Sequence, residues 1–562
     1  MNLRLTQIFI VITVFSSYAT YAKANVEQAT REIELPTSRD IEKKLTPLPV
    51  KKPVIEEEIQ IPIRTGPSFF VTKINLSGCE SVPSQEFQII TEKYENKELD
   101  LEDINNIAKE IEKEYLRKGI IAVCYLPPQD IKDGALTLKI IEARMGELIL
   151  GEKTKYFNKD MLKFYWDTPS GEILRYDKIL QSLNLMNENP DREVRAILHA
   201  GKEPGTTDIS LEEKTYFPLH PTFSFDREGS VYTGKERTTV GFRHNNLLFL
   251  DDIFLSGYMF GREFSGYYFY HKIPFTNFGT SFMYGYSYSK LFPKKELEYF
   301  GIESQFRTLS FFLYQNIFKD GNYLGEVYSG LDAEDKKSTI PGGTFNKDRL
   351  RVVRVGGNFI HRGFLDGTTF INPEISCGIN GLGARKKDAL SSRGAANTFS
   401  KFNLRVTHQK DLPMDFQSII NLAGQVSTTK LSPQETFYLG GIKSVRGYPA
   451  GDFLADNTFL TNIELLIPIP FIPDEIKIPS ASKSFKDNVK GIVFFDYAYG
   501  MQRGTVPEGD KKHVNMASIG AGIRVKLIDK SFLKFEWGFP VGDKPITESG
   551  RSRFHISIDC EL

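Results

Sequence analysis

The chain has 562 residues and a formal net charge of zero at pH 7, because 71 lysine and arginine residues are balanced by 71 aspartate and glutamate residues. This length predicts several domains, and the lack of a net positive charge argues against a nucleic-acid-binding protein with a broad basic surface. Aromatic residues make up 12% of the chain, but the mean hydropathy is slightly negative. A bundle of membrane-spanning helices, which needs spans of roughly 20 apolar residues, is therefore disfavoured.

The N-terminus has the pattern of a secretory signal peptide. Arg4 supplies a positive charge, residues 8–15 form the apolar centre, and residues 22–24 (Ala-Lys-Ala) fit a small-x-small cleavage site. The apolar run is short for a membrane anchor, which is the alternative. We predict that residues 1–24 are a signal peptide and that the protein is exported. The four cysteines are spread too widely to indicate a disulfide framework, and a pairing of Cys79 with Cys124 stays open.

Residues 25–67 are predicted to be an N-terminal segment with a proline-rich linker. The first part is polar and charged, and the second part has prolines at positions 47, 49, 53, 62 and 67. Closely spaced prolines favour extended, polyproline-like backbone. Residues 46–67 are therefore expected to be a solvated linker.

Residues 68–143 are predicted to form a compact α/β unit. Strand patterns begin and end it, and a long amphipathic helix lies between them, with Asp100 as its N-cap and Gly119 in the C′ position. Apolar residues recur at helical spacing in this segment: Leu101, Ile104, Ile107, Ala108, Ile111 and Tyr115. A shorter helix, capped by Ser84, precedes it. The predicted order is β-α-α-β-β.

Residues 144–217 are predicted to repeat this architecture. A strand pattern opens the segment, an amphipathic helix follows around residues 176–183, and two strand patterns close it at residues 192–198 and 207–211. The two units share an order of elements but little sequence.

From residue 218 to 562 the pattern changes to alternation with a period of two. In one run Phe282, Tyr284, Tyr286 and Tyr288 share a face, while small and polar residues occupy the other. Segments of about ten residues that alternate in this way are typical of a transmembrane antiparallel β-barrel. A soluble β-sandwich also alternates, but the predicted export and the clusters of Tyr and Phe favour the barrel. The length suits sixteen strands, at about 21 residues for each strand and its connection.

Residues 440–448 (Gly-Gly-Ile-Lys-Ser-Val-Arg-Gly-Tyr) place Arg446 in a glycine-rich loop. Glycine permits a tightly folded loop, and a guanidinium removed from water needs a partner. In the later strand pattern 492–499 the alternation directs Phe494, Asp496 and Ala498 into the lumen. We hypothesise that Arg446 reaches Asp496 there; the alternative is a surface turn and an unrelated acid. Because a lumen is wet, we expect the pair to contribute about 1–3 kcal/mol.

Several motifs resemble those of one family. Residues 128–131 (Pro-Gln-Asp-Ile), 133–134 (Asp-Gly), 189–192 (Asn-Pro-Asp-Arg) and 201–205 (Gly-Lys-Glu-Pro-Gly) are similar to the POTRA signatures of two-partner secretion transporters, also called haemolysin secretion/activation proteins. The lid-loop motif of that family is similar to the segment Val445, Arg446, Gly447 and Tyr448 in this chain. Its barrel-wall partner motif is similar to Phe494 and Asp496. Related strands often have Gly two residues after the acid, where this chain has Ala498.

The resemblance implies a mixed fold of two periplasmic POTRA domains (68–143 and 144–217) and a sixteen-stranded barrel (218–562) in the outer membrane of a Gram-negative cell. It also implies a function: the POTRA domains capture the N-terminal secretion domain of an exoprotein of adhesin, haemolysin or toxin type. The partner then crosses the pore unfolded and without ATP. Strand addition to an exposed sheet edge is a physical route for the capture. A monomer with no bound cofactor, metal or nucleic acid is expected.

Two other functions compete with export. A barrel-assembly insertase has a similar architecture but usually more POTRA units, and a passive diffusion porin needs none. Sequence motifs of common enzymes, such as Gly-x-Ser-x-Gly, His-Glu-x-x-His and the phosphate-binding loop, are absent from the chain. We therefore expect a transporter and not an enzyme.

Overall fold

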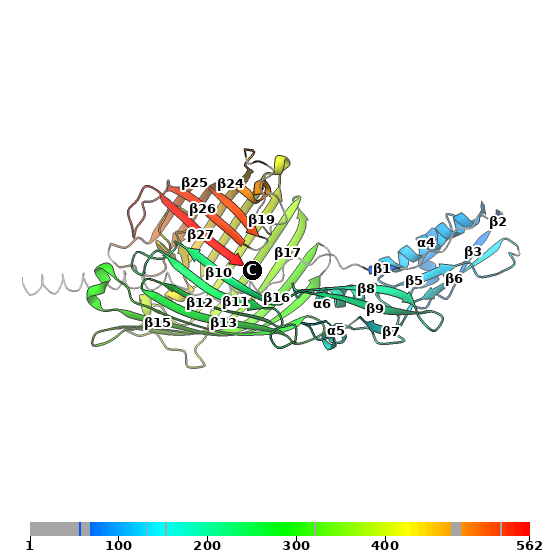
Figure 1. The fold of residues 1–562 in the computed structure, drawn as a ribbon, viewed down its shortest axis with the longest axis horizontal. Coiled ribbons are helices and arrows are strands. Elements are labelled where there is room, and N and C mark those ends of the chain that lie inside the picture. Colours follow the sequence, from blue (N-terminus) through cyan, green and yellow to red (C-terminus); the bar gives the residue numbers. More distant parts are fainter. Residues whose placement is uncertain are drawn as a thin grey trace, which may run out of the picture.

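The computed structural model describes residues 55–57 and 68–562, except for 132, 152–153, 320–321, 472, 474–484, 508 and 529–530. The predicted signal peptide (1–24) and most of the predicted segment 25–67 lie outside the described residues. A large barrel forms one end of the molecule and two α/β units form the other (Figure 1). In the described part of the chain, no helix is both long enough and apolar enough to cross a membrane.

The first α/β unit has a three-stranded sheet and one long helix. Its elements are β2 (Phe69–Val71), β3 (Lys73–Ser77), η1 (Ser84–Phe87), α3 (Gln88–Thr91), β4 (Lys97–Leu99), α4 (Leu101–Arg117), β5 (Ala122–Tyr125) and β6 (Ala135–Glu142). The sheet has the order β3-β6-β5, and β2 pairs separately with β4. The strand β6 is therefore central, and β3 and β5 are the two edges.

The helix α4 confirms the predicted periodicity and its ends. The Asp100 carboxylate accepts a hydrogen bond from the Asp103 backbone N–H, the Asp103 carboxylate accepts one from the Asp100 backbone N–H, and Gly119 has a φ of +79° just after the helix. Its buried face packs on the sheet through Ile104, Ile107, Ala108, Ile111 and Tyr115. The shorter helix differs from its prediction. It begins as a 3-10 turn after Pro83, without a side-chain cap, and ends at Thr91.

The second unit comprises β7 (Arg144–Leu150), α5 (Asp160–Tyr165), α6 (Tyr176–Met186), β8 (Arg192–Ala200) and β9 (Thr206–Thr215). Its sheet has the order β1-β8-β9-β7, in which β1 is Ile55–Glu57. The expectation of a solvated linker over 46–67 is therefore wrong for three residues, which pair in parallel with β8 from Ala196 to Leu198. The physical reason is that β8 would otherwise expose unpaired backbone N–H and C=O groups at a sheet edge.

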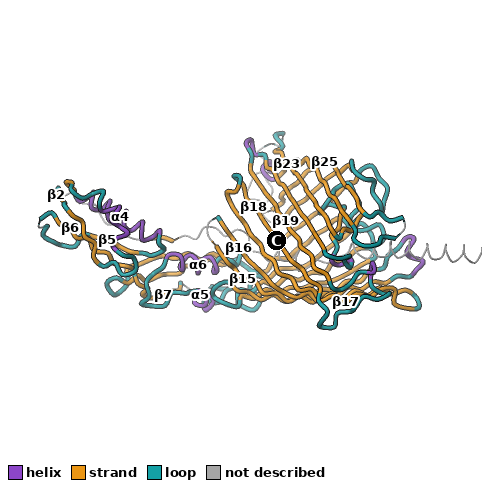
Figure 2. Tube along the Cα trace, turned by 180° about the vertical axis from the view of Figure 1, so that it is seen from behind, coloured by secondary structure: helices purple, strands orange, loops and turns teal. Residues whose placement is uncertain are grey.

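Backbone hydrogen bonds join the two units to each other. Ile121 N donates to Leu174 O (3.2 Å), Leu174 N to Ala143 O (2.7 Å), and Tyr176 N to Gly119 O (2.8 Å). Because these bonds link the end of α4 and the β6–β7 junction to the start of α6, the two units are held in one arrangement. They extend as a rod away from the barrel (Figures 1 and 2).

The four cysteines carry free thiols in the structure. Burial raises the pKa of the Cys124 thiol to about 12, because it disfavours the thiolate. Cys124 is consequently a packing residue of the first unit.

The described residues of the C-terminal part form a closed antiparallel barrel, which confirms the predicted sixteen strands. These are β10 (Leu219–Asp226), β11 (Arg237–His244), β12 (Ile253–Gly261), β13 (Phe264–Pro274), β14 (Thr280–Leu291), β15 (Glu303–Lys319), β16 (Tyr323–Ile340), β17 (Gly343–Phe364), β18 (Gly367–Gly378), β19 (Phe399–Asp411), β20 (Gln417–Ser427), β23 (Asn457–Pro468), β24 (Val489–Met501), β25 (His513–Ile528), β26 (Ser531–Pro540) and β27 (Arg553–Glu561). The barrel closes where β10 pairs with β27, from Thr222↔Glu561 to Asp226↔Ser557. Short helices lie in the connections: η2 (Lys295–Phe300), η3 (Ser392–Gly394), η4 (Pro413–Asp415), η5 (Pro433–Glu435) and α7 (Phe485–Asn488).

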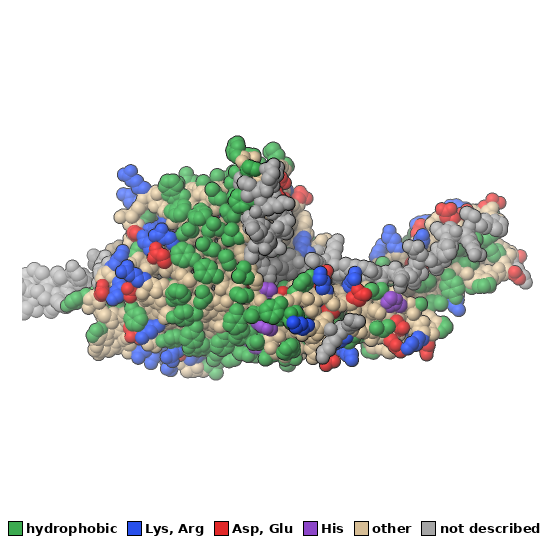
Figure 3. Space-filling model, in the orientation of Figure 1, with side chains coloured by type: hydrophobic (Ala, Val, Ile, Leu, Met, Phe, Trp, Pro, Cys, Tyr) green, Lys and Arg blue, Asp and Glu red, His purple; other side chains and the backbone are tan. Residues whose placement is uncertain are grey.

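The predicted alternation is confirmed on the strands. Along β14 every second residue, from Met283 to Leu291, is buried inside the barrel, and the three tyrosines between them face outward. On β24, Val493 and Phe495 are exposed on the outer face. Hydrophobic side chains form a continuous area on the outer wall (Figure 3). An apolar surface of this kind suits the hydrocarbon of a bilayer. Its residues are the outward-facing members of the period-two alternation along each strand.

The connection between β20 and β23, residues 428–456, folds back into the barrel; we call it the inserted loop. It contains a hairpin of β21 (Phe437–Leu439) and β22 (Phe453–Ala455). Apolar residues of the loop pack with the barrel wall in one buried cluster: Leu439, Val445, Tyr448, Phe453 and Ala455 from the loop, with Leu460, Ala498, Val514 and Met516 from the wall. The inserted loop is thus part of the barrel interior.

Candidate functional site

The glycines of residues 440–448 determine the path of the inserted loop. Gly440, Gly441 and Gly447 have φ values of +104°, +89° and +89°, a region that disfavours residues with a side chain. A Cβ on Gly447 would also lie 3.0 Å from the carbonyl carbon of Gly538 on β26. The backbone of the loop tip therefore lies directly against the barrel wall, and Arg446 is next to that contact.

Arg446 and Asp496 are in direct contact. Arg446 donates through Nε to Asp496 Oδ2 (2.8 Å) and through Nη2 to Oδ1 (2.6 Å), and its backbone N–H donates to Oδ2 (3.0 Å). The side chain of Arg446 is 2% exposed and that of Asp496 is 0% exposed. The two parallel bonds form the bidentate geometry that suits a guanidinium and a carboxylate.

Two further carboxylates contact the same guanidinium. Nη1 of Arg446 lies 2.7 Å from Glu464 on β23 and 3.0 Å from Glu536 on β26. Arg524 on β25 bridges Glu464 and Glu536 from the side, at 2.8 and 2.7 Å. We call Asp496, Glu464 and Glu536 the acidic seat. Four neighbouring strands therefore meet at the tip of the inserted loop.

An aromatic ring completes the seat. The guanidinium carbon of Arg446 lies 3.5 Å from the ring centroid of Phe494 on β24. A cation over an aromatic face gains about 2 kcal/mol or more where water is excluded. Phe494 and Asp496 are two residues apart on one strand, so the pleat directs both toward the lumen, as the alternation predicted.

The expectation of a wet lumen around Arg446 is wrong. The apolar cluster of the inserted loop surrounds the charged group and excludes solvent. Removing one partner from a buried ion pair costs about 3–5 kcal/mol, because the other charge remains buried without compensation. Loss of either partner is therefore expected to cost more than the range of about 1–3 kcal/mol expected for a wet pair.

Sequence reasoning missed Glu464 and Glu536. Each lies in an otherwise mostly apolar strand at a lumen-facing position, and that isolated acid was the available signal. The strand register explains why Glu464 reaches Arg446. Glu464 pairs with Phe494 across β23 and β24, and Asn462 pairs with Asp496. Asn462 also donates to Asp496 (2.9 Å) and to the Ser444 carbonyl of the loop (2.6 Å).

The other motif residues fix the tip. Val445 and Tyr448 are fully buried, and the Tyr448 hydroxyl donates to the carbonyl of Asp543 (2.7 Å). Gly447 N–H donates to His555 Nε2 (3.1 Å), and His555 Nδ1 lies 2.7 Å from Glu228. Since the backbone N–H must be the donor, Nδ1 of His555 carries the ring proton and donates to Glu228.

The departure at Ala498 has a structural explanation. Its methyl group is fully buried in the apolar cluster against the inserted loop. A small side chain at this position leaves space for the loop beside β24.

Residues 189–192, quoted above as a POTRA signature, contact the barrel. Arg192 makes a bidentate ion pair with Asp251 in the turn between β11 and β12, at 2.9 and 2.6 Å. Asp191 contacts His220 (2.9 Å) and accepts a hydrogen bond from Asn245 (2.7 Å). We call this contact the joint. It fixes the second α/β unit against the near end of the barrel, which the sequence did not indicate.

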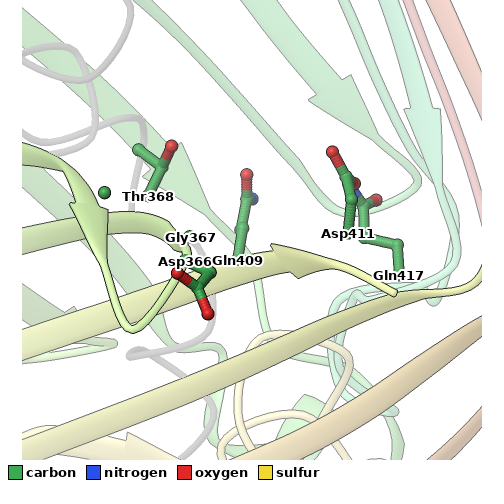
Figure 4. Close-up of a pocket in the computed structure, with 7 residues that line it drawn as sticks. Asp366, Gly367, Thr368, Gln409, Asp411 and Gln417 are labelled. Carbon is green, nitrogen blue, oxygen red and sulfur yellow. The ribbon is translucent and has the colours of Figure 1, made fainter. Parts of the chain in front are cut away.

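A polar pocket of about 420 Å³ lies at the same end of the barrel, between the β17–β18 and β19–β20 turns. Thr368 and Gln409 are cross-strand partners, and both are an even number of residues from the inward-facing Ser376 and Lys401. Figure 4 shows Thr368, Gln409 and Asp411 pointing to the same side of the wall. Amide, hydroxyl and carboxylate groups are thus available to a polypeptide backbone at this mouth.

Comparison with known families decides the identity of this architecture. The model of the haemolysin secretion/activation protein family ShlB/FhaC/HecB matches residues 205–525, and the model of the POTRA domain, ShlB-type, matches residues 69–143. The chain belongs to the haemolysin secretion/activation protein family. As a two-partner secretion transporter, it lies in the outer membrane, its N-terminal units face the periplasm, and it exports a partner protein.

Relatives and solved structures agree with this assignment. The heme/hemopexin transporter protein HuxB of Haemophilus influenzae is 22% identical over 511 residues, which cover 88% of this chain and 87% of the relative. The outer membrane transporter CdiB of Dickeya dadantii (strain 3937) is 24% identical over 410 residues, covering 69% and 72%. The structure of CdiB from Escherichia coli has a TM-score of 0.70 at 19% identity, covering 88% and 91%. BamA from Haemophilus ducreyi shares the fold more distantly, with a TM-score of 0.54 at 14% identity, covering 88% and 100%.

Proposed function

We propose that this protein exports one large exoprotein through the barrel lumen, unfolded and without ATP, and that Arg446 and the acidic seat hold the inserted loop in the pore at rest. The observation that carries the proposal is the fully buried Arg446 with its three carboxylates. A loop folded into the barrel interior also argues against a passive diffusion porin. The incoming polypeptide displaces the tip, and its folding outside the cell favours forward movement.

We further propose that the two α/β units, taken as POTRA domains over 68–143 and 144–217, capture the exoprotein by strand addition. Pairing of the linker strand β1 with β8 supports this, because it shows that an edge of the second sheet accepts an extended chain. The exoprotein is of adhesin, haemolysin or toxin type and binds through its N-terminal secretion domain. The closed barrel forms from one chain, so we propose that the protein acts as a monomer. We also propose that it acts without a cofactor.

Export can be tested before the partner is known. Deleting the gene identifies the client as the large protein that disappears from the culture medium. Complementation with the wild-type chain restores it, and the Arg446→Ala variant is expected to lower its amount by about tenfold or more, as the loss of a buried ion pair implies. Arg351→Ala is the matched control, because Arg351 pairs with the partly exposed Asp335 and lies away from the acidic seat.

A culture medium that is unchanged by the gene deletion would contradict export. Equal export by the Arg446→Ala and wild-type chains would contradict the role of the loop contact. Migration of heated and unheated samples in gels checks that each variant barrel has folded.

A further inference from the structure

A second buried ion cluster holds the inserted loop, on a different part of the wall. Glu435 ends the short helix η5 at the start of the loop and is 0% exposed. Arg354 on β17 lies 2.6 Å from Glu435 Oε1, and Lys401 on β19 forms an ion pair with Glu435 Oε2 and donates to the Glu435 carbonyl (2.7 Å). None of these three residues belongs to the acidic seat or contacts Arg446.

The wall itself holds Arg354 in place. Arg354 also contacts Asp332 (2.6 Å) and Glu334 (2.8 Å) on β16, and Glu374 (3.8 Å) on β18. Of the four carboxylates around Arg354, Glu435 alone belongs to the loop. The cluster is therefore a preformed binding site on the wall, into which the loop inserts one acid.

The two clusters occupy separate parts of the barrel wall. Glu435 contacts β17 and β19, the eighth and tenth of the sixteen strands, and Arg446 contacts β23, β24 and β26, the twelfth, thirteenth and fifteenth. The centres of the two contacts are therefore about a quarter of the circumference apart. The strand β21 lies between Glu435 and Arg446 along the inserted loop. A loop fixed at two places on the wall is held more firmly than a loop fixed only at its tip.

We infer that Glu435 is a second anchoring residue of the inserted loop, with Arg354 and Lys401 as its receptor on the wall. The two contacts have opposite charges on the loop. The loop supplies the acid Glu435 in this cluster, whereas it supplies the base Arg446 at the tip. Loss of the tip contact alone leaves the loop tethered inside the lumen by Glu435. This inference deepens the proposed role of the loop in export, and its consequence for export rests on that proposal.

Trypsin treatment of intact cells tests the anchoring without any client. Lys443 is exposed next to the buried tip, but the lumen excludes the protease, so cleavage after Lys443 reports movement of the loop out of the barrel. Glu435→Ala is expected to raise the cleavage rate by about tenfold. Asp335→Ala is the matched control, because it removes a neighbouring wall acid that pairs with Arg351 and not with Arg354 or the loop. The control is expected to remain protected like the wild type.

The double variant of Glu435→Ala and Arg446→Ala tests whether the loop has one anchor or two independent anchors. If the anchors are independent, Glu435→Ala combined with Arg446→Ala is cut faster than either single variant, by about a further tenfold. Wild-type protection of Glu435→Ala would overturn the inference. So would cleavage of the Asp335→Ala control as fast as that of Glu435→Ala, or a double variant that is cut no faster than the singles.

Should Glu435→Ala fail to assemble, Glu435→Gln is measured in the same way. It keeps the shape of the side chain but removes its charge, and faster cleavage than in the wild type is again expected. Unchanged cleavage of an assembled Glu435→Gln barrel would overturn the inference. Because cleavage needs no exoprotein, its outcome is separate from any failure of export.

Discussion

At the scale of single residues, the geometry of Arg446 matters as much as its charge. The side chain uses a planar fork for Asp496, a third nitrogen for Glu464 and Glu536, and its flat face for Phe494. A lysine ammonium is a point charge and cannot make these contacts together. The seat therefore selects arginine.

Arg446→Lys is accordingly expected to fail although it conserves the charge. The variant should show larger ion currents in planar bilayers than the wild type, because the tip leaves the seat for part of the time, and export should fall by about tenfold. Arg351→Lys provides the control, with wild-type currents expected. Wild-type currents and export for Arg446→Lys would show that charge alone is sufficient.

Gly447 offers a second test at this scale. Gly447→Ala places a residue with a side chain at a φ of +89° and brings its Cβ to 3.0 Å from the backbone of Gly538. The conformation alone costs about 1–2 kcal/mol, and the contact adds to it. Gly342→Ala has a similar φ of +98° with nothing within 4 Å, so it isolates the conformational cost. Trypsin should cut the loop faster in Gly447→Ala than in Gly342→Ala, and equal rates would contradict the close approach.

At the scale of elements, the joint positions the second α/β unit against the near end of the barrel. Arg192→Ala should loosen it, because Asp251 is left buried without its cation. Arg195→Ala is the control on the same strand β8, where the pair with Glu212 is half-exposed and contributes little. Hydrogen exchange in the β11–β12 turn of the full-length protein should become faster in Arg192→Ala only. Unchanged exchange would mean that other contacts fix the unit.

The first α/β unit should lose stability in acid through Glu142. Burial by itself raises the pKa of the Glu142 carboxyl, but hydrogen bonds from Ser81, Glu80 and Tyr115 outweigh it and lower the pKa below the ordinary value of 4.5. The ionised Glu142 carboxylate therefore contributes fully to the stability of the unit above its ordinary pKa. This contribution is lost as the pH falls through the lower pKa of the folded state. Hydrogen exchange around β6 should accelerate in that window, and Glu142→Gln should remove the pH dependence. Equal acid sensitivity in Glu142→Gln would point to another group.

Some elements could be predicted from sequence and others could not, for physical reasons. The helix α4 has caps and a periodic face, so local rules determine it. The strand β1 forms because a distant edge is available, and no local pattern in residues 55–57 carries that information. Parity along one strand predicted that Asp496 faces the lumen, and its contact with Arg446 was expected from the family motifs that the two segments resemble. Glu435 depends on the three-dimensional path of the loop, which only the folded barrel determines.

At the scale of the whole molecule, the barrel, the inserted loop and the two α/β units form one connected path. The units are bonded to each other, the joint bonds the second unit to the barrel, and the polar pocket lies at the mouth that faces them. The outer surface of the barrel is apolar (Figure 3), while its interior holds buried ion pairs. Charge inside the barrel is thus concentrated where the loop is held.

The most direct test of this account is a double-mutant cycle on export with Arg446→Ala and Asp496→Ala, scored as the amount of client in the culture medium. Each single variant is expected to reduce export by about tenfold or more while the barrel still assembles, and the double variant should lose little more, because both changes remove one contact. Wild-type export from both assembled single variants, or losses that simply multiply in the double variant, would contradict the central claim that this contact controls the pore.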